Sequence, residues 1–261
     1  VAVDAAHGAS APADADGSSS DDLEQRAYRA YEDQDWPQAS RLIAQAIALA
    51  PDQAGLYRLK AYIAAATGDD AGVLAAAEQA LQRDPGDAES LQLRGSARAK
   101  AGDAQGALAD YAAALQAGWH TSGFFRNYLY VLNQQHANAR MLEVHAAYED
   151  AYRRDPEGTG LHPDIPFHAA QAYQHLGQPR RALDLLDQAI AQSPQVAGYY
   201  GNRALAQHAL GRSSQSLADD ARAMQLDPTE PLYPYNRGVT RLDMGDAAGA
   251  LQDFKAALAL G

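Results

Sequence analysis

The residues best suited to metal or acid–base chemistry are the eight histidines, because the chain contains no cysteine. On one helix His168 and His175 would lie about two turns, or ~10.5 Å, apart, which is too far for one ion. No His-x-x-x-His pair and no carboxylate pair with acid–base spacing occurs, and no glycine-rich loop suited to a phosphate is present. We therefore expect no catalytic residue, no metal site, no cofactor and no enzyme activity.

Amide side chains at a regular spacing suggest binding instead. His168, Asn202 and Asn236 follow one another at intervals of 34 residues, and Asn127 occupies the matching place in the preceding repeat. An amide both donates and accepts hydrogen bonds. A column of amides can therefore pair with the main chain of an extended peptide. The alternative is that these side chains bond between neighbouring repeats.

A repeating pair of helices must position this column. Residues 88–101 and 104–117 both carry small or apolar residues three to four positions apart, so each is predicted to be an amphipathic helix. Gly102 permits the left-handed conformation at the end of the first helix, and Asp103 can cap the second. Such a hairpin is too small to bury its own apolar face and needs neighbours.

The period of the chain is 34 residues. Prolines recur at the ends of second helices, where the missing N–H forbids continuation: Pro51, Pro85, Pro194 and Pro228. Counting from the start of each repeat, small residues recur at positions 8, 20 and 27, as in Ala27, Ala39 and Ala46. This pattern resembles the tetratricopeptide repeat. The resemblance implies an all-α fold, a right-handed superhelical solenoid of about seven helix hairpins.

Four segments are expected. Residues 1–22 are predicted to be a disordered acidic tether, because they lack apolar content. Repeats 1–4 occupy residues 23–156, and the three surplus residues of repeat 4 are expected in its turn, around 135–138. Residues 157–166 are predicted to be an irregular linker, since their glycines and prolines do not continue a helix. Repeats 5–7 occupy residues 167–261.

Both ends of the chain suggest a longer natural protein. The sequence begins at Val1 rather than methionine, so we expect a processed or cut form. Leu251, Leu258 and Leu260 lack a following helix, so we expect the chain to continue beyond Gly261. Without that cover, the last repeat would favour end-to-end self-association. A tether of this composition favours a periplasmic or secreted location over a cytoplasmic one.

The resemblance also implies a concave groove, lined by positions 2, 5, 6, 9, 12 and 13 of each first helix, where peptide segments bind. The candidate groove residues are Tyr28, Tyr31, Arg58, Tyr62, Arg126, Asn127, Tyr130, His168, Gln171, His175, Asn202, Tyr235 and Asn236. A clamp for a peptide carboxylate, known in this family, is not expected. The stripe offers only Arg58, Lys100 and Arg126, which belong to three different repeats.

Of the three classes of partner, nucleic acid, membrane and protein, the composition favours protein. The formal net charge is −12, which opposes binding to nucleic acid or to an anionic membrane surface. No apolar run reaches the ~20 residues of a membrane span. We therefore predict a non-enzymatic scaffold that binds a protein or peptide segment. Two alternatives stay open: the periplasmic half of an outer-membrane exopolysaccharide-export or receptor protein, and the regulatory domain of a larger enzyme.

Overall fold

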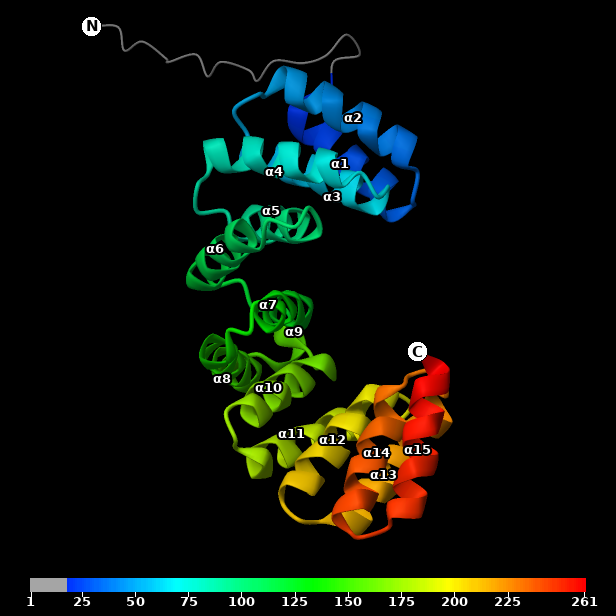
Figure 1. The fold of residues 1–261 in the computed structure, drawn as a ribbon. Coiled ribbons are helices and arrows are strands. Elements are labelled where there is room, and N and C mark those ends of the chain that lie inside the picture. Colours follow the sequence, from blue (N-terminus) through cyan, green and yellow to red (C-terminus); the bar gives the residue numbers. More distant parts are fainter. Residues whose placement is uncertain (1–17) are drawn as a thin grey trace, which may run out of the picture. The chain divides into compact units, whose positions relative to one another are not determined.

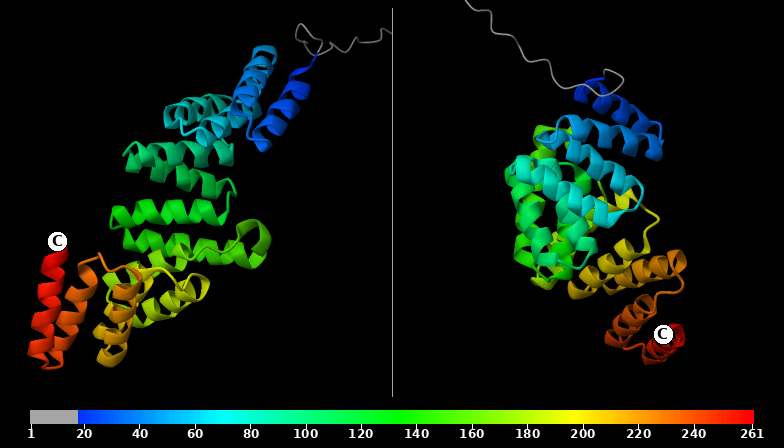
Figure 2. Two further views of the ribbon diagram at one scale, coloured as in Figure 1. Left: turned by 90° about the vertical axis from the view of Figure 1, so that its right-hand side faces the viewer. Right: turned by 90° about the horizontal axis from the view of Figure 1, so that it is seen from above.

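The computed structural model describes residues 18–261, which form fifteen α-helices (Figure 1). They fall into two compact units, the first ending at Trp119 and the second running from His120 to Gly261. Apart from one short helix, the helices pair into hairpins whose two members lie side by side (Figure 2). Seven such hairpins are present, as the sequence predicts.

The first unit holds three hairpins. Their helices are α1 (Ser20–Glu32), α2 (Trp36–Leu49), α3 (Ala54–Ala66), α4 (Asp70–Arg83), α5 (Ala88–Lys100) and α6 (Ala104–Gln116). The predicted tether lies mostly outside the described residues. Its boundary at residue 22 is wrong, because α1 already begins at Ser20: the Ser19 side chain accepts a hydrogen bond from the Asp22 N–H, and acidic residues favour this end of a helix.

The second unit holds four hairpins and one short helix. Its helices are α7 (Ser122–Gln134), α8 (Asn138–Arg154), α9 (Pro156–Thr159), α10 (Asp164–His175), α11 (Pro179–Gln192), α12 (Ala197–Ala209), α13 (Ser213–Leu226), α14 (Leu232–Asp243) and α15 (Ala247–Leu260). The short helix α9 packs against α8.

Two boundary predictions in the second unit are wrong. The surplus of repeat 4 lies in α8, which has 17 residues against 13 or 14 in the other second helices, and not in the turn. The expected irregular linker is partly helical. Asp155 caps α9 by accepting a hydrogen bond from the Gly158 N–H. Pro166 lies in the first turn of α10, where its missing N–H has no helical partner to lose.

The same turn closes every hairpin. Three residues separate the two helices, and the middle one has a positive φ in all seven hairpins. Five of these residues are glycine, which adopts this conformation without steric cost. The other two are Gln34, with φ of 59°, and His136, with φ of 53°.

Within a hairpin, small residues of the first helix receive aromatic rings of the second. A Cβ atom at Gly95 would lie 2.9 Å from the Tyr111 ring, and one at Gly238 would lie 2.6 Å from the Phe254 ring. Both contacts are closer than carbon atoms allow, so the ring occupies the space that a side chain would need. The small-residue pattern of the sequence therefore reports direct helix contact.

An ion pair between the two helices recurs in three hairpins and is called here the Arg–Asp clasp. In each clasp a buried aspartate of the second helix pairs with an arginine sixteen residues earlier, at 2.5–2.7 Å: Arg94–Asp110, Arg203–Asp219 and Arg237–Asp253. In two hairpins a second arginine one turn later, Arg98 or Arg241, binds the same carboxylate. The clasp ties the two helices of one repeat together.

The surface of the last hairpin keeps several leucines uncovered. Leu251 and Leu258 are 55% and 81% exposed, and Leu260 is also exposed, as expected for side chains without a following helix. Among residues 18–261 there is no helix with the length and apolar character that crossing a membrane requires.

Candidate binding site

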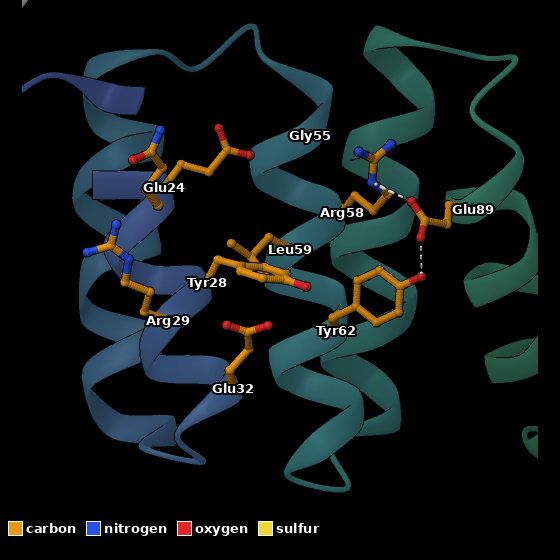
Figure 3. A pocket seen from close by; sticks show the side chains of 10 residues that line it. Glu24, Tyr28, Arg29, Glu32, Gly55, Arg58, Leu59, Tyr62 and Glu89 are labelled. Carbon is orange, nitrogen blue, oxygen red and sulfur yellow. Dashed lines mark hydrogen bonds and ion pairs between the residues drawn. The ribbon is translucent and has the colours of Figure 1, made fainter. Parts of the chain in front are cut away.

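The first helices of the first unit form a pocket of about 480 Å³ (Figure 3). Helices α1 and α3 supply its walls, and one residue comes from α5. The lining residues are Glu24, Gln25, Tyr28, Arg29, Glu32, Gly55, Arg58, Leu59, Tyr62 and Glu89. Three predicted groove residues, Tyr28, Arg58 and Tyr62, are thus brought together in one pocket.

A row of tyrosines forms the aromatic part of this site. Tyr28 is 51% exposed, and its ring stacks against that of Tyr31 with centroids 6.4 Å apart. Tyr31 also meets Tyr62 edge-on at 6.4 Å. Because Tyr31 packs against the hydrophobic core of the first repeats, it holds the rings on both sides of it in place. Tyr31 therefore supports the site rather than lining the pocket.

Two side chains of the pocket are fixed by bonds to the next repeat. Arg58 pairs with Asp87 at 2.7 Å and with Glu89 at 2.9 Å, and the Tyr62 hydroxyl donates to Glu89 at 2.6 Å. Burial opposes the charge of Arg58, but the two carboxylates outweigh it and raise the pKa of its guanidinium. Burial and the bond to Glu89 raise the pKa of Tyr62 far above its usual range. The arginine is charged and the tyrosine neutral at physiological pH.

Two other acids of the pocket have no such partner. Glu24 and Glu32 lie four residues before and after Tyr28, on the same face of α1. Neither side chain makes a hydrogen bond or ion pair within residues 18–261, and the same holds for the Arg29 side chain. These three charged groups are therefore available to a ligand.

In the second unit, predicted groove residues meet between α7 and α10. The Gln171 side-chain oxygen accepts hydrogen bonds from Asn133 and from His168 Nδ1, both at 3.2 Å. The exposed Tyr130 ring lies 6.2 Å from the buried His168 ring. Burial lowers the pKa of His168, so its ring is neutral at physiological pH.

Two of the three asparagines in the column bond within their own repeats. The Asn127 oxygen accepts from the neighbouring Arg126 guanidinium at 3.0 Å, and the Asn202 amide donates to the Gly198 carbonyl at 2.9 Å. Asn236 makes no side-chain hydrogen bond in the described part of the chain. None of these asparagine side chains joins two repeats in residues 18–261, so the inter-repeat alternative does not describe them.

The remaining predicted residues are scattered over the second unit. Arg126 also approaches the His162 ring at 3.4 Å, and His175 Nδ1 lies 3.2 Å from the Asn138 side-chain oxygen. Tyr235 is 52% exposed, with its ring 5.7 Å from that of Phe254. None of these residues lines the pocket of the first unit.

Of the seven lining residues that the sequence analysis leaves out, all but Arg29 occupy groove positions of their repeats. Glu24, Gln25 and Glu32 are positions 5, 6 and 13 of repeat 1, which are groove positions. Gly55 and Glu89 are position 2 of the next two repeats. Applying the stripe to every residue type, and not only to aromatic, basic and amide side chains, would have found them. Within residues 18–261 no three His, Cys, Asp or Glu side chains are grouped to hold a metal ion.

Comparison with known proteins supplies the family. The family model described as tetratricopeptide repeat matches residues 167–231, which include all of α11, α12 and α13. The chain is a tetratricopeptide repeat protein. The family that matches is a repeat family and not an enzyme family, and tetratricopeptide repeat domains bind proteins and peptides.

Solved structures and a curated relative show how far this likeness extends. A tetratricopeptide repeat protein from Parabacteroides merdae is 17% identical, with 93% of each chain covered and a TM-score of 0.58. Pseudomonas aeruginosa pilF is 15% identical, with 82% of this chain and 94% of that chain covered and a TM-score of 0.63. At such identities the likeness concerns the fold. The human DnaJ homolog subfamily C member 7 is 33% identical over 89 residues, which are 34% of this chain and only 18% of that protein.

Proposed function

We propose that this tetratricopeptide repeat protein is a non-enzymatic scaffold that binds a peptide or protein segment on the first-helix faces of its repeats. The observation that carries the proposal is the pocket on α1 and α3, where an exposed tyrosine stands beside a hollow of about 480 Å³. A concave site with an aromatic anchor is typical of segment recognition.

The physical basis of such binding is a surface fixed before the ligand arrives. Tyr31 holds the neighbouring rings, and the bonds of Arg58 and Tyr62 to Glu89 join repeats 2 and 3. Side chains that are already ordered lose little conformational entropy on binding, so more of the contact energy appears as affinity. Aromatic rings supply large contact area with few rotatable bonds.

A library of capped heptapeptides, randomised at all positions, tests the proposal. We expect the wild-type chain to retain a defined subset of peptides and Tyr28→Ala to bind that subset at least tenfold more weakly, because an exposed aromatic anchor is lost. Leu176→Ala is the matched control, since Leu176 is 45% exposed but lies in a hairpin turn. Equal binding by the wild type and the Tyr28 variant would remove this pocket from the proposed function.

A further inference from the structure

We propose that the pocket on α1 and α3 receives a positively charged side chain of the bound segment, with arginine preferred to lysine. This inference rests on the proposed function, because it names the ligand group that the peptide would present. Three features of the pocket support it. The lining charges are negative in sum, two free carboxylates lie beside an aromatic ring, and the pocket has space and an apolar wall for the stem of a long side chain.

The charges that line the pocket are negative in sum. Three carboxylates, those of Glu24, Glu32 and Glu89, face two guanidinium groups, those of Arg29 and Arg58. The charge of Arg58 is already shared between Glu89 and Asp87, which is not among the lining residues. A cation entering the pocket would therefore gain attraction from Glu24 and Glu32, against which only Arg29 acts.

The free carboxylates are placed where a guanidinium on the tyrosine would reach them. Glu24 and Glu32 lie one helical turn on either side of Tyr28, and Figure 3 shows their carboxylates on opposite sides of its ring. A cation within about 6 Å of an aromatic ring is attracted by the electrons of its face. Arginine fits better than lysine because its planar group stacks on the ring while its N–H groups bind a carboxylate in pairs.

The pocket also has room and an apolar wall for the stem of such a side chain. Gly55 is one of its lining residues, and the nearest atoms to a Cβ built there are Glu24 Oε1 at 3.6 Å and an Arg58 nitrogen at 3.9 Å. Leu59 and the Tyr62 ring line the wall. The methylene groups of an arginine can pack along these residues while the charged end meets the carboxylates.

A negatively charged ligand group fits the site poorly. A peptide carboxylate would have only Arg29 to bind, because Arg58 is already engaged by two carboxylates. It would also approach Glu24 and Glu32, which carry like charge. The site therefore differs from a carboxylate clamp in the charge of the ligand group that it accepts, which is positive instead of negative.

Five capped heptapeptide libraries test the charge directly. Their central residue is arginine, lysine, citrulline, glutamate or leucine, and the six other positions are randomised. Citrulline has nearly the shape of arginine without its charge. We expect the arginine library to bind the full chain about tenfold more tightly than the citrulline library, with lysine between them, and we expect the difference to shrink as salt is raised.

Two double variants assign the effect to the pocket. The double variant Glu24→Gln with Glu32→Gln should abolish the arginine preference. It should melt like the wild type, because neither glutamate side chain has a partner to lose. The control, Glu157→Gln with Asp184→Asn, removes the same charge from exposed positions of α9 and α11 and should keep the preference.

The outcomes separate the inference from the function on which it rests. Equal binding of the arginine and citrulline libraries, or an equal loss in the control variant, would overturn the inference. If the glutamate or leucine library binds best and its binding depends on Tyr28, the proposed function stands and the inference is wrong. If no library depends on Tyr28, the proposed function of this pocket fails as well.

Discussion

The two units build the same hairpin but present different first-helix faces. At position 6 of the repeats the first unit has Gln25, Leu59 and Leu93, whereas the second has Asn127, His168, Asn202 and Asn236. The first face is hollowed between tyrosines and leaves two carboxylates without partners. On the second face Asn127, His168 and Asn202 bond within the chain. A regular polar column is therefore not by itself a free binding surface.

The difference also appears in how neighbouring repeats are joined. In the first unit ion pairs cross between repeats, such as Arg58–Asp87 and Lys100–Asp70. The second unit also has one such pair, Arg203–Asp187, but it adds uncharged or histidine-containing bonds between repeats, such as Asn133–Gln171 and His208–Thr240. The common hairpin is thus compatible with different chemistry between repeats, and this contrast can be tested one unit at a time.

The largest expected effect comes from breaking an Arg–Asp clasp. Asp110→Ala leaves Arg94 and Arg98 without their shared carboxylate and should lower the free energy of unfolding of the first unit by about 3–5 kcal/mol. Hydrogen exchange should show loss of protection in α5 and α6. The matching Asp253→Ala should act on α14 and α15, and exposed Asp184→Ala should change little. Equal loss of protection throughout the chain from either clasp variant would show that the units do not unfold separately.

The second effect depends on pH and belongs to the second unit alone. In repeat 6 the buried Asp220 occupies the position of Tyr111 and Phe254, and neither carboxylate oxygen has a hydrogen-bond partner among the described residues. Burial raises the pKa of Asp220 to about 7, against the pull of Arg237. An unfolded aspartate ionises near pH 4. The folded chain therefore keeps a proton that the unfolded chain releases, and stability falls as the pH rises from about 4 to about 7.

Asp220→Asn removes this titration and is the test. Relative to the variant, the wild type should lose up to about 4 kcal/mol of unfolding free energy between pH 4 and pH 7, with a constant difference above pH 7. Denaturant unfolding of both proteins at pH 5, 6, 7 and 8 measures the difference, in which the other groups largely cancel. A difference that does not change with pH would show that Asp220 is ionised in the folded chain.

A smaller effect concerns the one turn in each unit that lacks glycine. Gln34→Gly and His136→Gly should each stabilise their unit by about 0.5–1 kcal/mol, because a side chain is strained at positive φ. The reverse changes, Gly68→Ala and Gly177→Ala, should destabilise by a similar amount. Thermal melting checks all four variants. A loss of stability in the first pair would show that the side chain at this turn makes a contact that outweighs the strain.

The smallest expected effect on binding comes from the asparagine column. Replacing Asn127, Asn202 and Asn236 together by alanine should leave peptide binding at the first unit unchanged. The loss in unfolding free energy should stay below about 1 kcal/mol per residue, because two of these side chains bond only within their own helix and alanine favours helices. Titration with the arginine library measures the binding. A weaker affinity for that library would mean that the column takes part in binding at the first unit.

Much of the fold could be predicted because local rules determine it. Proline, glycine and small residues at a period of 34 specify the hairpins, and Asp103 caps its helix as expected. The longer α8 is missed although it could have been predicted, because residues 138–154 contain no glycine or proline that would stop the helix earlier. Pro166 shows the converse: a residue that ends helices elsewhere is accommodated in a first turn.

The candidate site could be predicted only in part, because a pocket depends on distances between repeats. The sequence singles out Tyr28, Arg58 and Tyr62, but it does not show that Arg58 is held by Asp87, 29 residues later. Nor does it show that Glu24 lacks a partner. Whether a charged side chain is free or paired is a property of the packed helices, and that property decides which ligand the pocket accepts.

The Arg–Asp clasp has a consequence for how arrays of this kind can grow. Both of its partners lie within one repeat, so a gene duplication of 34 codons copies the clasp complete, together with its glycine and its ring. Bonds such as Arg58–Glu89 lie between repeats, and a duplication places one partner against a new neighbour. The contacts inside a copied repeat are therefore inherited intact. The contacts on its surface towards the neighbour must arise anew by mutation, and the pocket of the first unit lies on such a surface.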